Sequence, residues 1–176
     1  MKNIILTFIF LSLSSIVCGQ PSFQNGEEYA ADKNTYVFKH SVNSTGQINR
    51  HYHTFVNINN KKREPEEYKW PESFIFESVH NLMEILSDVY GDELHKKVTV
   101  TLQLYFGMDG KVIETEIGFI SENEQVNTTI HQIEILENLI KNKIRIHFDR
   151  NNPAYRNTKW FSFDIQLNLV SLIAKD

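Results

Sequence analysis

Cysteine is almost absent from this sequence, because the 176 residues include only one, Cys18. Cys18 lies within residues 1–19, and the chain that follows has no thiol. Such a chain cannot form a disulfide, use a thiolate nucleophile, or bind zinc or an iron–sulfur cluster through cysteine. The fold must therefore be stabilised by its hydrophobic core, and the remaining length is enough for one domain.

Charge is scarce in residues 1–19, which contain one lysine and no acidic residue. Residues 4–17 form an apolar run that is shorter than the roughly 20 residues of a membrane span and is typical of a signal peptide. We predict cleavage after Gly19 and export to the periplasm or the medium, with no transmembrane segment left in the mature chain. A lipid anchor on Cys18 fits less well, since the three residues before it lack the leucine and small residue usual in lipoprotein signals. An uncleaved anchor is the other alternative.

Basic residues are outnumbered, with 18 Lys and Arg against 22 Asp and Glu, which gives a net charge of −4. This balance argues against nucleic-acid binding, which needs a basic face. Glycine is also sparse, and the sequence has no phosphate-binding glycine loop, no His-Glu-x-x-His motif and no Gly-x-Ser-x-Gly elbow. The sequence therefore predicts no cofactor and no assembled catalytic motif.

Several stretches are rich in β-branched and aromatic residues or alternate apolar with polar side chains, which predicts strands. These stretches are residues 35–42, 48–58, 98–107, 111–120 and 159–170. The first two are expected to form an N-terminal hairpin, and Asp109-Gly110 predicts a tight turn between the third and the fourth. Residues 20–34 are polar and are expected to form a flexible lead before a single domain over residues 35–176.

Two stretches have the spacing of amphipathic helices. Residues 71–90 carry an apolar stripe, with Pro71 suited to the first turn and Gly91 suited to the position just past the end. Residues 127–143 keep the same spacing, and Asn127 is the expected N-cap. The sequence therefore predicts two helices.

The predicted fold is α+β: an antiparallel sheet, made of the 98–120 hairpin and the C-terminal strand, packs on two helices and is accompanied by the N-terminal β-hairpin. One face of the sheet should contact the helices through Val100, Leu102, Ile113, Ile117, Phe163 and Ile165. The opposite face should carry Thr99, Thr101, Gln103, Asp164, Gln166 and Asn168.

Two residue pairs have spacings that could support chemistry. His51 and His53 would share one face of a strand, which is a usable metal geometry, but no third ligand is evident in the sequence. Glu114 and Glu116 would share a strand face as well, and paired carboxylates can act as acid and base in a cleft. The simpler interpretation of both pairs is a solvated polar strand face.

Residues 96–170 resemble the C-terminal domain of TonB-type energy transducers. The similarity lies in Val98-Thr99-Val100-Thr101-Leu102-Gln103-Leu104, in Asp109-Gly110-Lys111-Val112, in the 127–143 helix and in the aromatic-led stretch from Trp160 to Leu169. The Val-Cys-Gly-Gln end of the signal segment also resembles exported proteins of Bacteroidetes-type bacteria. The chain has only four prolines and no Pro-rich arm, so the resemblance implies the fold without the transduction role.

The resemblance implies that the final strand lies at the sheet edge and pairs with a peptide strand of an envelope protein. The residues expected to face such a partner are Trp160, Ser162, Asp164, Gln166 and Asn168. We therefore expect an exported, non-enzymatic binding or protein-interaction module of the cell envelope. A small exported metal-dependent hydrolase or ligand-binding enzyme is the alternative, and a purely structural envelope component is left open.

The last strand is long and strongly β-prone, so an uncovered edge there would favour aggregation. The N-terminal hairpin is the only other β-rich element that could cover it. We expect residues 35–58 to pair with residues 159–170 and extend the sheet. The other outcome is that the hairpin packs elsewhere and leaves the edge open for a partner.

Overall fold

The structure is a computed structural model, and it describes residues 22–42, 45–60, 74–91, 98–121, 128–149, 151–155 and 158–168. The signal segment, Pro71, Asn127 and the residues after position 168 lie outside this part. The strands are β1 (Glu28–Ala30), β2 (Thr35–Val42), β3 (Ile48–Asn57), β4 (Val98–Gly107), β5 (Val112–Ser121) and β6 (Trp160–Asn168). The helices are α2 (Phe74–Tyr90), α3 (Ile130–Lys143) and the short 3-10 turn η2 (Pro153–Tyr155).

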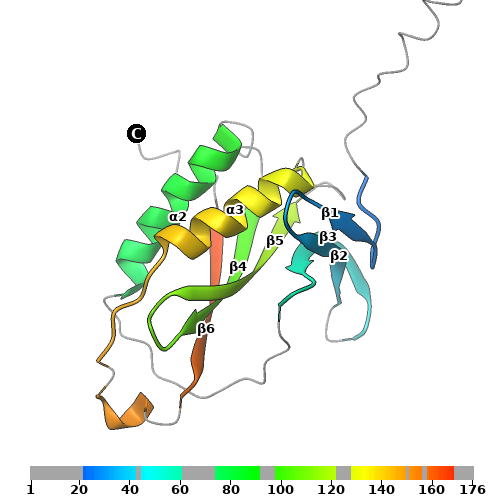
Figure 1. Cartoon of the computed structure of the whole chain (residues 1–176). Coiled ribbons are helices and arrows are strands. Elements are labelled where there is room, and N and C mark those ends of the chain that lie inside the picture. The colour runs from blue at the N-terminus through cyan, green and yellow to red at the C-terminus, as the bar shows by residue number, and fades with distance from the viewer. Residues whose placement is uncertain are drawn as a thin grey trace, which may run out of the picture.

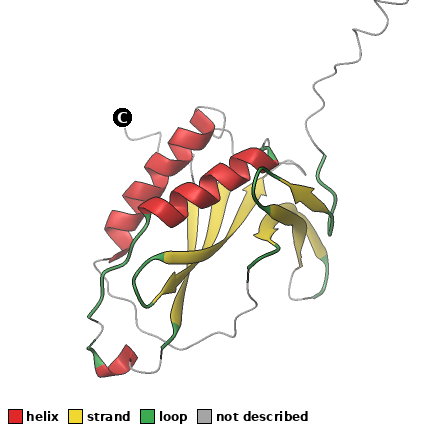
Figure 2. Ribbon diagram, viewed as in Figure 1, coloured by secondary structure: helices red, strands yellow, loops and turns green. Residues whose placement is uncertain are grey.

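The described strands form one sheet in the order β1-β2-β3-β5-β4-β6, and every neighbouring pair is antiparallel. The predicted α+β class is confirmed, and so are the N-terminal hairpin, now β2 and β3, and the β4–β5 hairpin around Asp109-Gly110. Gly110 has a φ of 79°, as such a turn requires. Figures 1 and 2 show α2 and α3 together on one face of the sheet.

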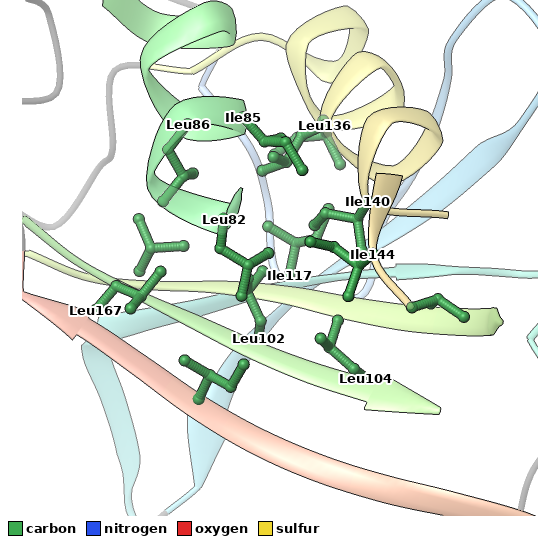
Figure 3. Packing of buried hydrophobic residues seen from close by; sticks show 14 of the residues in the cluster. Leu82, Ile85, Leu86, Leu102, Leu104, Ile117, Leu136, Ile140, Ile144 and Leu167 are labelled. Atoms are coloured by element: carbon green, nitrogen blue, oxygen red, sulfur yellow. The ribbon is translucent and has the colours of Figure 1, made fainter. Parts of the chain in front are cut away.

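The core lies between that face and the two helices (Figure 3). Leu82 and Leu86 of α2, Ile140 of α3 and Leu102 of β4 are all at most 2% exposed. The inward positions predicted at Val100, Leu102, Ile117 and Ile165 are buried, and Phe163 is partly buried. Burying side chains of this size stabilises a fold by about 1.5–3 kcal/mol each.

Ile113 departs from the predicted alternation and is 37% exposed. The register between β4 and β5 shifts after Tyr105, so Phe106 pairs with Val112 and Ile113 becomes the extra residue of a bulge. Val112 takes the inward position instead and is 5% exposed. A bulge changes which face each residue occupies, and the strand pattern alone does not reveal it.

The expected pairing of residues 35–58 with the C-terminal strand is wrong. β3 pairs with β5, whereas β6 pairs with β4, so the hairpin and β6 lie at opposite sides of the sheet. The described sheet order therefore ends at β6 on one side and at β1 on the other.

The lead predicted over residues 20–34 is not wholly irregular, because residues 28–30 form β1 and pair with β2. The first described residues also contact the core, since the Phe23 ring packs edge-on against Phe55 with centroids 4.9 Å apart. The N-cap of α3 is Thr129, whose hydroxyl accepts a hydrogen bond from the Gln132 backbone N–H at 3.2 Å. The Gln132 side chain accepts from the Thr129 N–H in return, which completes a capping box.

Candidate functional site: the β6 edge and the outer face of the sheet

The predicted partner-facing residues of β6 do not share one environment. Asp164 and Gln166 are exposed, and Ser162 is half-buried. Trp160 is only 7% exposed, and its ring lies 5.8 Å from that of Tyr105 on β4. Asn168 ends the strand, pairing with Thr99. The described polar side chains that β6 exposes to solvent are therefore in its second half, at Asp164 and Gln166.

Asp164 and Gln166 also belong to the sheet face that lies opposite the helices, here called the outer face. The strand register places their neighbours in two rows across the sheet. In one row Asp164 lies beside Gln103, which lies beside Glu116. In the next row Gln166 lies beside Thr101, which lies beside Gly118.

A hollow of about 260 Å³ lies over these rows. We call it the outer hollow, and it extends over β3, β5, β4 and β6. Its lining is mostly polar and consists of Tyr52, Thr54, Thr101, Leu102, Gln103, Glu116, Gly118, Asp164, Ile165 and Gln166.

Gly118 forms the floor of the outer hollow. A Cβ atom at this position would lie 2.2 Å from the Thr101 Oγ1 atom and 2.9 Å from the Tyr52 ring. Thr101 is 7% exposed, and its hydroxyl donates a hydrogen bond to the Tyr52 hydroxyl at 3.2 Å. Thr101 therefore lies on the outer face, as the alternating pattern predicts, but it is a buried part of the floor.

Carboxylates give the outer hollow a negative field. Burial raises the pKa of the Glu116 carboxyl, the nearby Lys39 ammonium lowers it, and the charges of Asp164 and Glu114 raise it further, with a net upward shift. Glu114 and Glu116 lie on one strand face, as predicted. Glu116 also lines the outer hollow, whereas the sequence pattern indicates only a solvated polar face.

His51 and His53 share the opposite, helix-facing side of β3. His51 is exposed and its Nδ1 atom lies 3.1 Å from the Ser121 carbonyl oxygen, whereas His53 is 1% exposed and stacks on Phe38. The Nδ1 atoms of His53 and His40 lie 3.2 Å apart. Among the described residues, neither histidine of the predicted pair belongs to a group of three possible metal ligands.

Glu134 is a buried carboxylate that sequence reasoning missed. It is 3% exposed and accepts hydrogen bonds from the backbone N–H groups of Asp32, Lys33 and Asn34 at 2.8–3.0 Å. Burial alone would raise the pKa of this carboxyl, but the hydrogen bonds from Lys33, Asn34 and Asp32 hold it below its ordinary value. These hydrogen bonds hold the β1–β2 turn against α3, and Figure 1 shows the two close together.

Asp32 and His131 lie next to Glu134, and the three side chains are close enough to hold a metal ion. The Glu134 carboxylate, however, already accepts four hydrogen bonds, including one from the Asn34 side-chain amide at 3.0 Å. Asp32 and His131 are exposed and form their own contact at 3.4 Å. A cation would have to compete with this set of donors, so we assign Glu134 to the structure of the β1–β2 turn.

Glu137 makes a second buried connection one turn later on α3. Its carboxylate accepts a hydrogen bond from the Tyr36 hydroxyl, from Asn57 Nδ2 at 3.1 Å and from Lys141 Nζ at 2.6 Å. Burial and the neighbouring carboxylate raise the pKa of the Tyr36 hydroxyl. Glu134 and Glu137 together join the β1–β2 turn and strands β2 and β3 to the helix layer.

No described helix has the length and apolar character needed to cross a membrane. Comparison with known proteins finds no matching family model and no matching curated protein. The chain is similar to a solved structure of a DUF5043 family protein from Bacteroides uniformis ATCC 8492. That similarity has a TM-score of 0.58 and 12% sequence identity, and it covers 84% of this chain and 93% of the other. At this identity the similarity concerns the fold alone.

A sequence signal for the outer hollow does exist. Gly118 interrupts a strand two positions after Glu116, and an isolated glycine inside a strand often marks a close approach of other groups. The register of β4, β5 and β6 is needed to see that Glu116, Gln103 and Asp164 share a row. No local pattern indicates that Glu134 and Glu137 point inward, since glutamate is rarely buried.

Proposed function

We propose that this protein is an exported, non-enzymatic module that binds an extended segment of another cell-envelope protein at the β6 edge. The observation that carries the proposal is the sheet order, in which the described strands end at β6 and the N-terminal hairpin lies on the far side. A strand at a sheet edge can pair with a further strand through its main chain. The signal-like residues 1–19 support the location.

The chemistry of the partner follows from the two faces of β6. Ile165 and Leu167 point to the core side and are buried, whereas Asp164 and Gln166 are exposed on the outer face. An added strand would continue this alternation. The best partner is therefore an extended segment with apolar residues on the helix side and polar or basic residues on the outer side.

Site-specific photo-crosslinking in the producing cell tests the proposal. A photoreactive residue would replace Gln166 on the β6 edge, and a matched control would carry it at Asn138, which is exposed on α3. We expect position 166 to give a defined covalent adduct with an envelope protein, with the crosslink in an extended segment. Equal adducts from both positions, or none from position 166, would contradict the proposal.

A further inference from the structure

The outer hollow and the β6 edge are continuous, because Asp164 and Gln166 belong to both. A strand paired with β6 would place every second side chain over the outer face, next to these two residues. Neighbouring strands lie about 4.8 Å apart, so the long side chain of an arginine or lysine on the added strand extends over β6 toward β4. The end of such a side chain would lie past Asp164, between β6 and β4, at the β6 side of the outer hollow.

The charges in the outer hollow are arranged for a cation at that point. Asp164 and Glu116 lie on either side of Gln103 in one row, two strand spacings or about 10 Å apart. No basic side chain is among the described residues that line the hollow. Lys39 lies on β2 opposite Thr54, next to the β3 end of the hollow, and its charge acts on Glu116 from that side. A guanidinium or ammonium group between the two carboxylates would pair with Asp164 and reduce the repulsion between Asp164 and Glu116.

The outer hollow has room for such a group above this floor. At Gly118 the floor is closed, because the Thr101 Oγ1 atom and the Tyr52 ring occupy the space that a side chain would take, and Thr101 donates a hydrogen bond to Tyr52. The lining also includes the Gln103 and Gln166 amide groups, whose carbonyl oxygens accept hydrogen bonds. Apolar side chains would gain little here, since the two aliphatic residues among the lining, Leu102 and Ile165, are buried on the core side of the sheet.

We propose that the outer hollow receives the basic side chain of an arginine or lysine carried by the strand that pairs with β6. This inference rests on the proposed function, and it adds a specificity pocket to the edge. Main-chain pairing would supply affinity for extended segments in general, and the hollow would select those with a basic residue at one position.

The test uses two designed peptides that alternate valine and threonine and differ at one central outer position. One peptide carries arginine there, and the other carries citrulline, which has nearly the same shape without the charge. Binding is measured by titration calorimetry at physiological salt, and the site by NMR shifts of β6. The arginine peptide should bind the unaltered protein about tenfold more tightly, as expected for one charge-assisted contact.

Three variants assign the effect to the outer hollow. Glu116→Gln and Asp164→Asn should each remove most of the preference for arginine over citrulline. Glu114→Gln is the matched control, because it removes the same charge from the same strand outside the hollow lining, and it should keep the preference. Thermal unfolding of each variant checks that the fold is retained.

The outcomes separate the two proposals. Equal affinity of the two peptides, with shifts at β6, would overturn the hollow as a basic-residue pocket and leave strand pairing intact. An arginine preference that Glu114→Gln removes as strongly as Glu116→Gln would overturn it as well, since general electrostatics would then explain the effect. Failure of both peptides to perturb β6 would contradict strand pairing together with the pocket.

Discussion

Two buried carboxylates connect distant parts of this chain through hydrogen bonds. Glu134 and Glu137 are acidic residues of α3, yet they are only 3% and 1% exposed. Each is paired with donors from residues about 100 positions earlier in the chain. A buried carboxylate of this kind is stable only when its hydrogen bonds are complete. Single substitutions at these positions should therefore have larger effects than their polar character suggests.

Replacing Glu134 with glutamine should destabilise the protein by about 1–3 kcal/mol at pH 7, because the new amide faces backbone N–H donors. The lowered pKa of the Glu134 carboxyl gives the sign of the pH dependence. Its contribution is complete above the ordinary glutamate pKa of about 4.3 and is lost as pH falls through the lowered value.

Urea unfolding of the wild type and Glu134→Gln at pH 7 and pH 3 measures this effect, with the exposed Glu84→Gln as the control. We expect the difference between wild type and Glu134→Gln to shrink at the lower pH. A difference that stays constant with pH would show that the carboxylate charge is not what holds the β1–β2 turn.

Glu116 should behave in the opposite way, since its pKa is raised. A raised carboxyl pKa means that the folded state favours the protonated form, so stability is lost as pH rises through that value. Glu116→Gln should therefore raise the melting temperature at pH 7 and change it little at pH 4. Scanning calorimetry at the two pH values measures this, and a lower melting temperature at pH 7 would contradict it.

Leu102 tests the assignment of the two sheet faces. Leu102 lies on β4, faces the helices and is 1% exposed. Leu102→Ala should therefore lower the free energy of unfolding by about 2–5 kcal/mol. Gln166→Ala on the exposed outer face should change the unfolding free energy by no more than about 0.5 kcal/mol. Chemical denaturation measures both, and comparable losses would mean that the β6 register is shifted by one residue.

At the scale of elements, the sequence predicts most of what the structure contains. Strand alternation and helical spacing act locally, so they place β2, β3, β4, β5, β6 and both helices within a few residues of their bounds. The exceptions depend on contacts far away in the sequence. β1 forms because β2 pairs with it and Glu134 fixes the turn, and neither partner is visible in the polar stretch itself.

The start of α3 illustrates how several capping residues can compete. Residues 127–129 are Asn, Thr and Thr, and each is an acceptable N-cap. Thr129 takes the role because Gln132 lies three positions later and completes the capping box. Thr128 is 2% exposed, with its hydroxyl 3.0 Å from that of Tyr90.

Removing the cap should shorten or weaken α3. Thr129→Ala is expected to cost about 1 kcal/mol, since it leaves the Gln132 N–H without its acceptor. Asn138→Ala, at an exposed position inside the same helix, should be neutral or slightly stabilising, because alanine favours helix. Thermal unfolding of the two variants provides the comparison, and equal stability of both would contradict the cap assignment.

At the scale of the whole molecule, the order of the strands determines where a partner can bind. Sequence patterns establish that β2–β3 and β4–β5 are hairpins, but they do not state which hairpin lies beside which strand. That choice depends on α3, which packs on β5 and binds the β1–β2 turn, β2 and β3 through its two buried glutamates. The hairpin consequently extends the sheet beyond β5 and leaves β6 at the other side.

Hydrogen exchange over the whole sheet tests this order. The backbone amides of β4 and β5 lie between two strands each and should exchange slowly. In the second half of β6, from Asp164 to Asn168, alternate amides point away from β4 and should exchange much faster. Adding the arginine peptide should slow those amides and leave the opposite edge at β1 unchanged. Uniform slow exchange along β6 in the free protein would instead mean that another segment or a second copy already covers the edge.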